Sequence, residues 1–268
     1  MQTKLGFIGD NDLASVEADA KFAKEHGFEG IEYNYWGNFR ELTAETVKEM
    51  AAIHQAHGVR ACSLGLWGWN HLALDPKVRK EAHAQLKRAI EFARILRADV
   101  VITGGGDIAG EPLGRKIAEF RKVFPPFFKS AQKSGLRFAF YAVHGQSCFD
   151  SIAAYEAAWE HFPDLKIKFD AANWKHHGDD YLDLLRRYAH KIGHIHIKEH
   201  LYHGGTLASQ PAAGMGDIEW GKVFAFLYEK NYNGWLVIEP HGPLWGRAPL
   251  RKKMLLLTKR HISQFLIG

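Results

Sequence analysis

The chain has 268 residues, of which 46% are hydrophobic and 24% charged, and its formal net charge is +5. This composition predicts a globular protein with a large core and argues against a disordered chain. No apolar run reaches about 20 residues, so a membrane span is not expected. The start, Met1–Gly9, lacks the features of a signal peptide, and two cysteines cannot form a disulfide framework, so we expect a cytoplasmic protein with reduced thiols.

Short β-rich segments alternate eight times with longer amphipathic segments along the chain. The predicted strands are Leu5–Ile8, Gly30–Asn34, Arg60–Leu64, Val100–Thr103, Arg137–Tyr141, Lys166–Asp170, His194–Lys198 and Trp235–Glu239. The predicted helices cover 13–26, 43–57, 78–97, 113–134, 151–161, 179–190, 219–230 and 248–266. Thr43, Pro76 and Asp217 are helix-start signals.

This alternation implies parallel strands joined by right-handed crossovers. Eight such units in a chain of this length favour closure into a (β/α)8 TIM barrel over an open sheet. No change of composition and no linker divides the chain, so residues 1–268 are predicted to form a single domain.

Polar side chains follow several predicted strands, at the end of the barrel where active sites lie. Asp170, His196 and Glu239 end three successive strands, and this mixed oxygen and nitrogen set suits a divalent ion such as Mn, Mg, Co or Zn. Alternation puts His194 and Lys198 on the same face as His196. A turn-capping role for Asp170 and a hydrogen-bonded core role for His196 remain the alternatives.

Further residues at these strand ends are candidate contacts of a sugar, whose apolar faces stack on aromatic rings. They are Trp67, Trp69, Asn173, His176 and His194. Packing explains each aromatic residue equally well, and the histidines are equally compatible with ordinary loop positions.

Four segments resemble motifs of the xylose isomerase-like barrels, which include sugar and sugar-phosphate isomerases and epimerases of the D-tagatose 3-epimerase and hydroxypyruvate isomerase types. The segments are Phe169–Asn173, His194–Glu199, Gly214–Trp220 and Tyr232–Glu239, and the resemblance runs essentially end to end. It implies a metal held by Glu, Asp, His and Glu from the last four strands. Asp170, His196 and Glu239 match the last three positions. The first position departs from the family, because Tyr141 stands there with His144 shortly after it.

The resemblance implies an isomerase or epimerase of a sugar, sugar phosphate or related keto compound, in which two acid/base groups move a proton α to a carbonyl and a metal stabilises the enediolate. Glu239 is one candidate acid/base. Tyr141, with an ordinary pKa near 10, is a weak second candidate, and His144 suits the role better. Lys198 would add positive charge beside the developing oxyanion, or else pair structurally with a carboxylate.

Tyr141 also keeps a second reaction class open. Lyases and dehydratases of the same barrel family act on keto-sugars or oxidised glycosides through the same enolate chemistry. A non-catalytic sugar-binding barrel is a further alternative. A nuclease of the apurinic-site type would need about three zinc ions and more ligands than these strand ends supply. We therefore expect a small carbohydrate as partner rather than a nucleic acid or a membrane, and a homo-oligomer is compatible with the sequence.

Overall fold

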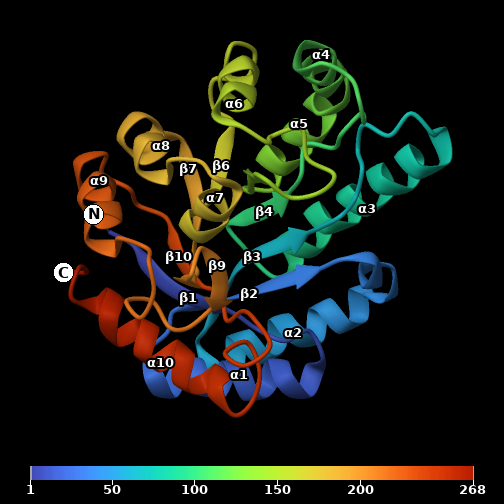
Figure 1. Ribbon diagram of the computed structural model, residues 1–268. Helices are drawn as coiled ribbons and strands as arrows, with labels where there is room; N and C mark the ends of the chain where they lie inside the picture. The colour runs from blue at the N-terminus through green and yellow to red at the C-terminus, as the bar shows by residue number, and fades with distance from the viewer. Residues whose placement is uncertain (1, 268) are drawn as a thin grey trace.

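The eight predicted strands form a closed parallel barrel, with the helices arranged in a ring around it (Figure 1). The structure is a computed structural model that describes residues 2–267. The barrel strands are β1 (Lys4–Ile8), β2 (Gly30–Tyr35), β3 (Arg60–Leu66), β4 (Val100–Thr103), β5 (Arg137–Tyr141), β6 (Lys166–Asp170), β7 (Ile192–Ile197) and β10 (Trp235–Ile238). Each pairs in parallel with its neighbours, and β10 closes the barrel against β1.

The helices are α1 (Leu13–His26), α2 (Ala44–His57), α3 (Pro76–Ile95), α4 (Leu113–Val123), α5 (Pro125–Lys133), α6 (Ile152–Trp159), α7 (Ala171–His177), α8 (Tyr181–Tyr188), α9 (Trp220–Glu229) and α10 (Leu250–Ser263), with short 3-10 turns at Gly37–Glu41 and Ala189–Lys191. Two of the predicted start signals act as expected. Thr43 accepts a hydrogen bond from the amide of Thr46, and Pro76 occupies the first turn of α3, where its missing amide hydrogen costs nothing.

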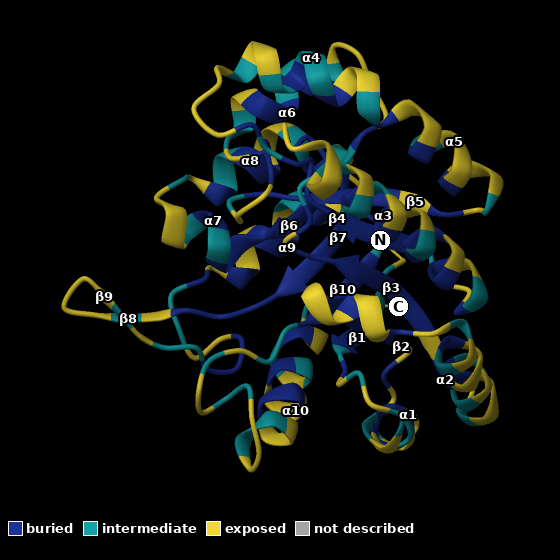
Figure 2. Cartoon of the chain, turned by 90° about the vertical axis from the view of Figure 1, so that its right-hand side faces the viewer, coloured by how far each residue is buried: buried dark blue, intermediate teal, exposed yellow. Residues whose placement is uncertain are grey.

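Three sequence expectations need correction. The single helix predicted over 113–134 is two helices, because Pro125 cannot donate the backbone hydrogen bond that would continue α4. Asp217 does not cap α9, since its carboxylate accepts the backbone amide of Tyr202 at 2.6 Å. The sequence also gave no indication of α7 or of the antiparallel hairpin formed by β8 (Leu201–His203) and β9 (Thr206–Ser209), which projects from the barrel (Figure 2).

The two faces of the strands are packed differently. Outward side chains such as Phe7, Phe169 and Ile195 join the main apolar core beneath the helices. Some inward side chains are also apolar, for example Trp235 and Val237. Towards the carboxyl ends of the strands the barrel interior becomes polar and charged. These buried inward residues are Glu32, Ser63, Lys168, Asp170, His194, His196 and Lys198.

Candidate metal and substrate site

Asp170, His196 and Glu239 converge at the carboxyl end of the barrel. Asp170 lies beside His196 in the register of β6 and β7, and Glu239 follows the last residue of β10. One ligand atom from each side chain lies within 4.8 Å of the others. Parallel strands therefore bring together three groups that are widely separated in the sequence.

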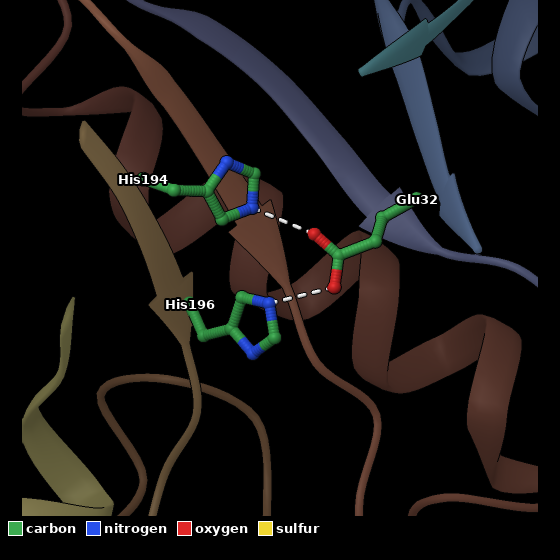
Figure 3. A group of neighbouring side chains, drawn as sticks. All are labelled: Glu32, His194 and His196. Carbon is green, nitrogen blue, oxygen red and sulfur yellow. Dashed lines mark hydrogen bonds and ion pairs between the residues drawn. The ribbon is translucent and has the colours of Figure 1, made fainter. Parts of the chain in front are cut away.

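The Glu32 carboxylate bonds both His194 and His196 (Figure 3). This carboxylate lies 2.6 Å from His194 Nε2 and 2.7 Å from His196 Nε2, and it also accepts hydrogen bonds from Ser63 Oγ and Asn34 Nδ2. An ionised carboxylate only accepts hydrogen bonds, so both histidines carry a proton on Nε2. His196 Nδ1 is consequently the nitrogen that faces Glu239, 2.7 Å from its Oε2.

Burial and charge shape the titration of these groups. Burial by itself would raise the pKa of Glu239, but Lys198 and His196 hold that pKa well below its usual range. Burial would likewise raise the pKa of Glu32, and the two histidines hold it well below normal. For His196, burial would lower the pKa, but Glu32 and Glu239 outweigh burial and raise it. Without a metal, the network therefore favours ionised carboxylates around a protonated His196.

Two lysines complete the charged cluster. Lys198 Nζ donates to Asn173 Oδ1 at 3.0 Å and to Glu239 Oε1 at 3.2 Å. Lys168 Nζ donates to Asp170 Oδ2 at 3.1 Å, and the other oxygen of Asp170 caps α7 by accepting the amide of Asn173. Asp170 thus has the capping role considered from the sequence while it also faces His196 and Glu239.

A cavity of about 670 Å³ opens above this cluster. His196, Lys198 and Glu239 lie in its lining, together with amide, imidazole and aromatic side chains. Those further lining residues include Asn11, Asn34, Trp36, Trp67, His144, Asn173, His176, His200, Gln210 and His241. Trp36 and Trp67 stack with ring centroids 6.0 Å apart. The cavity can therefore present an aromatic wall on one side and hydrogen-bonding groups on the other.

The sequence-predicted candidates divide into two groups. Trp67, His144, Asn173, His176 and Lys198 line the cavity, with His144 Nε2 3.0 Å from Asn173 Nδ2. Burial lowers the pKa of His144 to about 4, with Lys168 contributing, so its imidazole is neutral at pH 7.

Tyr141, Trp69 and His194 are not among the residues that line the cavity. Tyr141 stacks behind Trp67 with centroids 4.3 Å apart, and its hydroxyl bonds to the backbone of Gly68 and Gly145. Burial raises the pKa of Tyr141 to about 12. Trp69 packs under Arg40, whose guanidinium lies 4.6 Å from the ring centroid. His194 is fully buried against Glu32.

Glu32 and Lys168 are site residues outside the set that strand-end reasoning selected. Both lie within strands rather than at their ends, and both point inward. The sequence feature that identifies such residues is a charge inside a short predicted strand, on the same face as a candidate residue at the end of that strand. Lys168 shares its face with Asp170 in this way.

The donor set fits a divalent ion. Two carboxylates and one imidazole converge, and Glu32 fixes the ring nitrogen opposite the one that faces the cluster, an arrangement typical of metal-binding histidines. The departure is at Tyr141, which contributes no third carboxylate as a fourth ligand.

The fold and site can be compared with known proteins. A sequence profile described as the xylose isomerase-like TIM barrel matches residues 20–260, so the chain belongs to this family. A D-allulose 3-epimerase from Methylomonas sp., solved with D-allulose, has a TM-score of 0.81 and 15% identity over 99% of this chain and 98% of its own. An IolI protein with a bound zinc atom has a TM-score of 0.80 and 18% identity over 98% of both chains. At these identities the likeness shows the shared fold.

Curated relatives match a shorter stretch. Inosose dehydratases from Clostridium botulinum (strain Alaska E43 / Type E3) and Clostridium tetani (strain Massachusetts / E88) are 28% and 29% identical over 87 residues. This stretch is 27% of the chain and 29% of each relative's length, so most of each relative lies outside the match. Among residues 2–267, no helix is both long and apolar enough to cross a membrane.

Proposed function

We propose that this protein is a metal-dependent enzyme that isomerises or epimerises a sugar or related keto compound by removing a proton α to its carbonyl. The convergence of Asp170, His196 and Glu239 beneath a 670 Å³ cavity carries this proposal. The sugar epimerases among the structures that share its fold support the substrate class.

Asp170, His196 and Glu239 would hold the metal. A divalent ion there supplies positive charge to the carbonyl oxygen and to the oxyanion that develops when the α proton leaves. Lys198 lines the cavity beside Glu239 and would add a hydrogen-bond donor to the same oxygen. Asn173 holds the Lys198 ammonium in place.

Glu239 is the proposed base. Its carboxylate is ionised at neutral pH, lines the cavity and has both oxygens oriented, by His196 on one side and by Lys198 and His241 on the other. His144 is the proposed group for the second face of the substrate, because its neutral imidazole can accept a proton. Tyr141 is not proposed in this role, since it lies behind Trp67.

A lyase or dehydratase acting on a keto-sugar or oxidised glycoside is the second candidate. The observation that favours it is the neutral Tyr141 at the position where the family resemblance places a further carboxylate, because elimination needs one base and a departing group rather than two matched bases. The partial match to inosose dehydratases supports the same candidate. A non-catalytic sugar-binding barrel remains the alternative that the experiment must exclude.

The test is proton exchange in D2O with a panel of ketoses, inososes and 3-keto-glycosides, using protein of measured metal content. An epimerase incorporates deuterium at an inverted carbon, whereas a lyase releases water or the aglycone. We expect Glu239→Gln to abolish exchange at matched metal occupancy, and exposed Glu229→Gln to retain it. If the wild-type protein binds members of the panel but neither exchanges a proton nor releases a product, it is a binding protein and the proposed activity is wrong.

A further inference from the structure

Lys168 is a buried ammonium inside the candidate metal site. It is 2% exposed, and its one hydrogen bond to a side chain or backbone among the described residues is the 3.1 Å bond to Asp170 Oδ2. The Asp170 side chain is equally buried, at 3%. A charge this deeply buried is stable only when it is paired, so Lys168 and Asp170 depend on each other in the metal-free protein.

Within the described part of the chain, no carboxylate other than that of Asp170 lies within ion-pair distance of Lys168. In the strand register Lys168 lies between Tyr141 on β5 and His194 on β7. Tyr141 carries no charge and His194 donates its Nε2 hydrogen to Glu32, so neither side chain pairs with the ammonium. The face of Trp67 lies 5.4 Å from its Nζ and gives a further weak cation–π attraction. Asp170 is therefore the group that keeps the ammonium in this position.

A metal ion bound by Asp170, His196 and Glu239 would share one carboxylate with this ammonium. Two cations on one buried carboxylate repel each other strongly, because the low-dielectric interior screens them little. The position where the family resemblance places a further carboxylate holds Tyr141, the register neighbour of Lys168. Among the described residues, β5 therefore contributes no carboxylate that would offset the charge of the Lys168 ammonium.

We propose that Lys168 is an internal competitor of the metal: its ammonium holds Asp170 in the metal-free protein and weakens divalent-ion binding at the three-residue site. This inference rests on the metal site of the proposed function. It further implies preference for ions that bind imidazole strongly, such as Zn²⁺, over Mg²⁺, which relies on several oxygen ligands.

The test is the affinity of metal-stripped protein for Zn²⁺ and Mn²⁺, measured by competition with a chromophoric chelator. Lys168→Met removes the charge and retains an unbranched side chain of similar length. We expect it to bind both ions about tenfold more tightly or better, because the repulsion is lost. Its metal-free form should melt at a lower temperature than wild type, since Asp170 loses its partner, and added metal should raise its melting temperature more.

Lys166→Met is the matched control. Lys166 lies two residues before Lys168, on the same face of β6. Its ammonium donates to the carbonyl of His190 rather than to a carboxylate. Removing this charge should leave metal affinity near the wild-type value. Lys168→Arg retains the charge and should not tighten binding, and Lys168→Gln, neutral and still a donor to Asp170, covers the case in which the methionine variant does not fold.

Affinity that is unchanged or weaker in both neutral Lys168 variants, or that rises equally in Lys166→Met, overturns the proposal. So does a failure of the wild-type protein and the neutral variants alike to bind either ion. The result is separate from the proposed reaction, because metal affinity can rise in Lys168→Met whether or not any substrate in the exchange panel reacts.

Discussion

Glu32 is the residue on which the geometry of His196 depends. It is fully buried, accepts four hydrogen bonds and fixes the proton on His196 Nε2, so that Nδ1 faces the other candidate ligands. Carboxylates that orient a metal-binding histidine in this way typically contribute about 10- to 100-fold to metal affinity. Their effect is exerted through the histidine rather than by contact with the metal.

We therefore predict that Glu32→Gln weakens Zn²⁺ binding about 10- to 100-fold, because the amide neither carries the charge nor accepts from both histidines. Chelator competition on the stripped protein measures this. Glu29→Gln, at the residue just before the same strand, removes a carboxylate that accepts the amide of Leu5 and should leave metal affinity unchanged. Equal affinities in wild type and Glu32→Gln would show that His196 keeps its orientation without Glu32.

His71 gives a pH-dependent contribution to stability away from the candidate site. It is fully buried with Nε2 3.0 Å from Thr103 Oγ1, and burial lowers its pKa to about 3. An unfolded histidine titrates near 6.5, so between these values the unfolded chain binds a proton that the folded chain does not. Stability is therefore lost as the pH falls below about 6.5, by up to about 1.4 kcal/mol per pH unit.

The prediction is that His71→Gln, which is neutral at every pH, loses less free energy of unfolding between pH 7 and pH 5 than the wild-type protein. Urea unfolding at the two pH values measures the difference. The variant's stability at pH 7 serves as its own reference, so a packing defect does not affect the comparison. Parallel pH profiles for the two proteins would contradict a neutral His71 in the folded state.

For single residues, the sequence predicts a place in the site where a structural rule links the position along a strand to a place in the barrel. Asp170, His196 and Glu239 were identifiable because parallel strands gather their carboxyl ends at one mouth. Glu32 and Lys168 lie within strands, and their inward direction depends on the barrel's packing. Tyr141 was placed correctly at a strand end, but its ring turns behind Trp67, which only the three-dimensional packing determines.

Among the elements, the β8–β9 hairpin is the one whose removal should affect binding more than folding. Its residues are mostly exposed or intermediate in burial (Figure 2). Leu207 nevertheless lines the cavity, and the hydroxyl of Tyr202 lies 3.0 Å from Nδ1 of the cavity residue His176.

We predict that joining Leu201 to Ser209 through two glycines, in place of residues 202–208, weakens substrate binding about tenfold, consistent with the loss of a hydrogen bond and an apolar contact. The two ends are direct partners in the hairpin, so a short link spans them. Calorimetric titration measures the substrate affinity. Metal affinity should stay at the wild-type value, since no residue of the hairpin forms a hydrogen bond or ion pair with Asp170, His196 or Glu239. A large loss of metal binding would contradict this division of roles.

The elements also show which sequence signals were sufficient. All eight barrel strands were located because each is a short β-rich segment between amphipathic helical segments. The α7 helix was not predicted because it follows β6 without any loop. Asp170 both ends the strand and caps the helix. The hairpin was not predicted because its polar, glycine-containing sequence lacks the alternation of apolar and polar residues that marks a buried strand.

For the whole molecule, the critical step is closure of the barrel, where the first and last units of the chain must meet. Strand β1 pairs with β10, and Arg251 on α10 bonds the carboxylate of Asp19 on α1 through two nitrogens, each at 3.0 Å. Arg251 also donates to the carbonyl of Ile8 at the end of β1, at 2.9 Å. A single side chain thus ties the last helix to both the first strand and the first helix.

We predict that Arg251→Met lowers the free energy of unfolding by about 3–5 kcal/mol, because Asp19 is left as a buried carboxylate without its partner. Denaturant unfolding measures the loss. Arg260→Met on the same helix is the matched control, since Arg260 is exposed and its replacement should change stability by less than about 0.5 kcal/mol.

Because Arg251 joins segments 232 residues apart, the contact brings the two ends of the barrel together and should form late in folding. The loss should therefore appear mainly as faster unfolding, with refolding little changed. A variant as stable as the Arg260 control would show that strand pairing between β1 and β10 closes the barrel without the help of this ion pair.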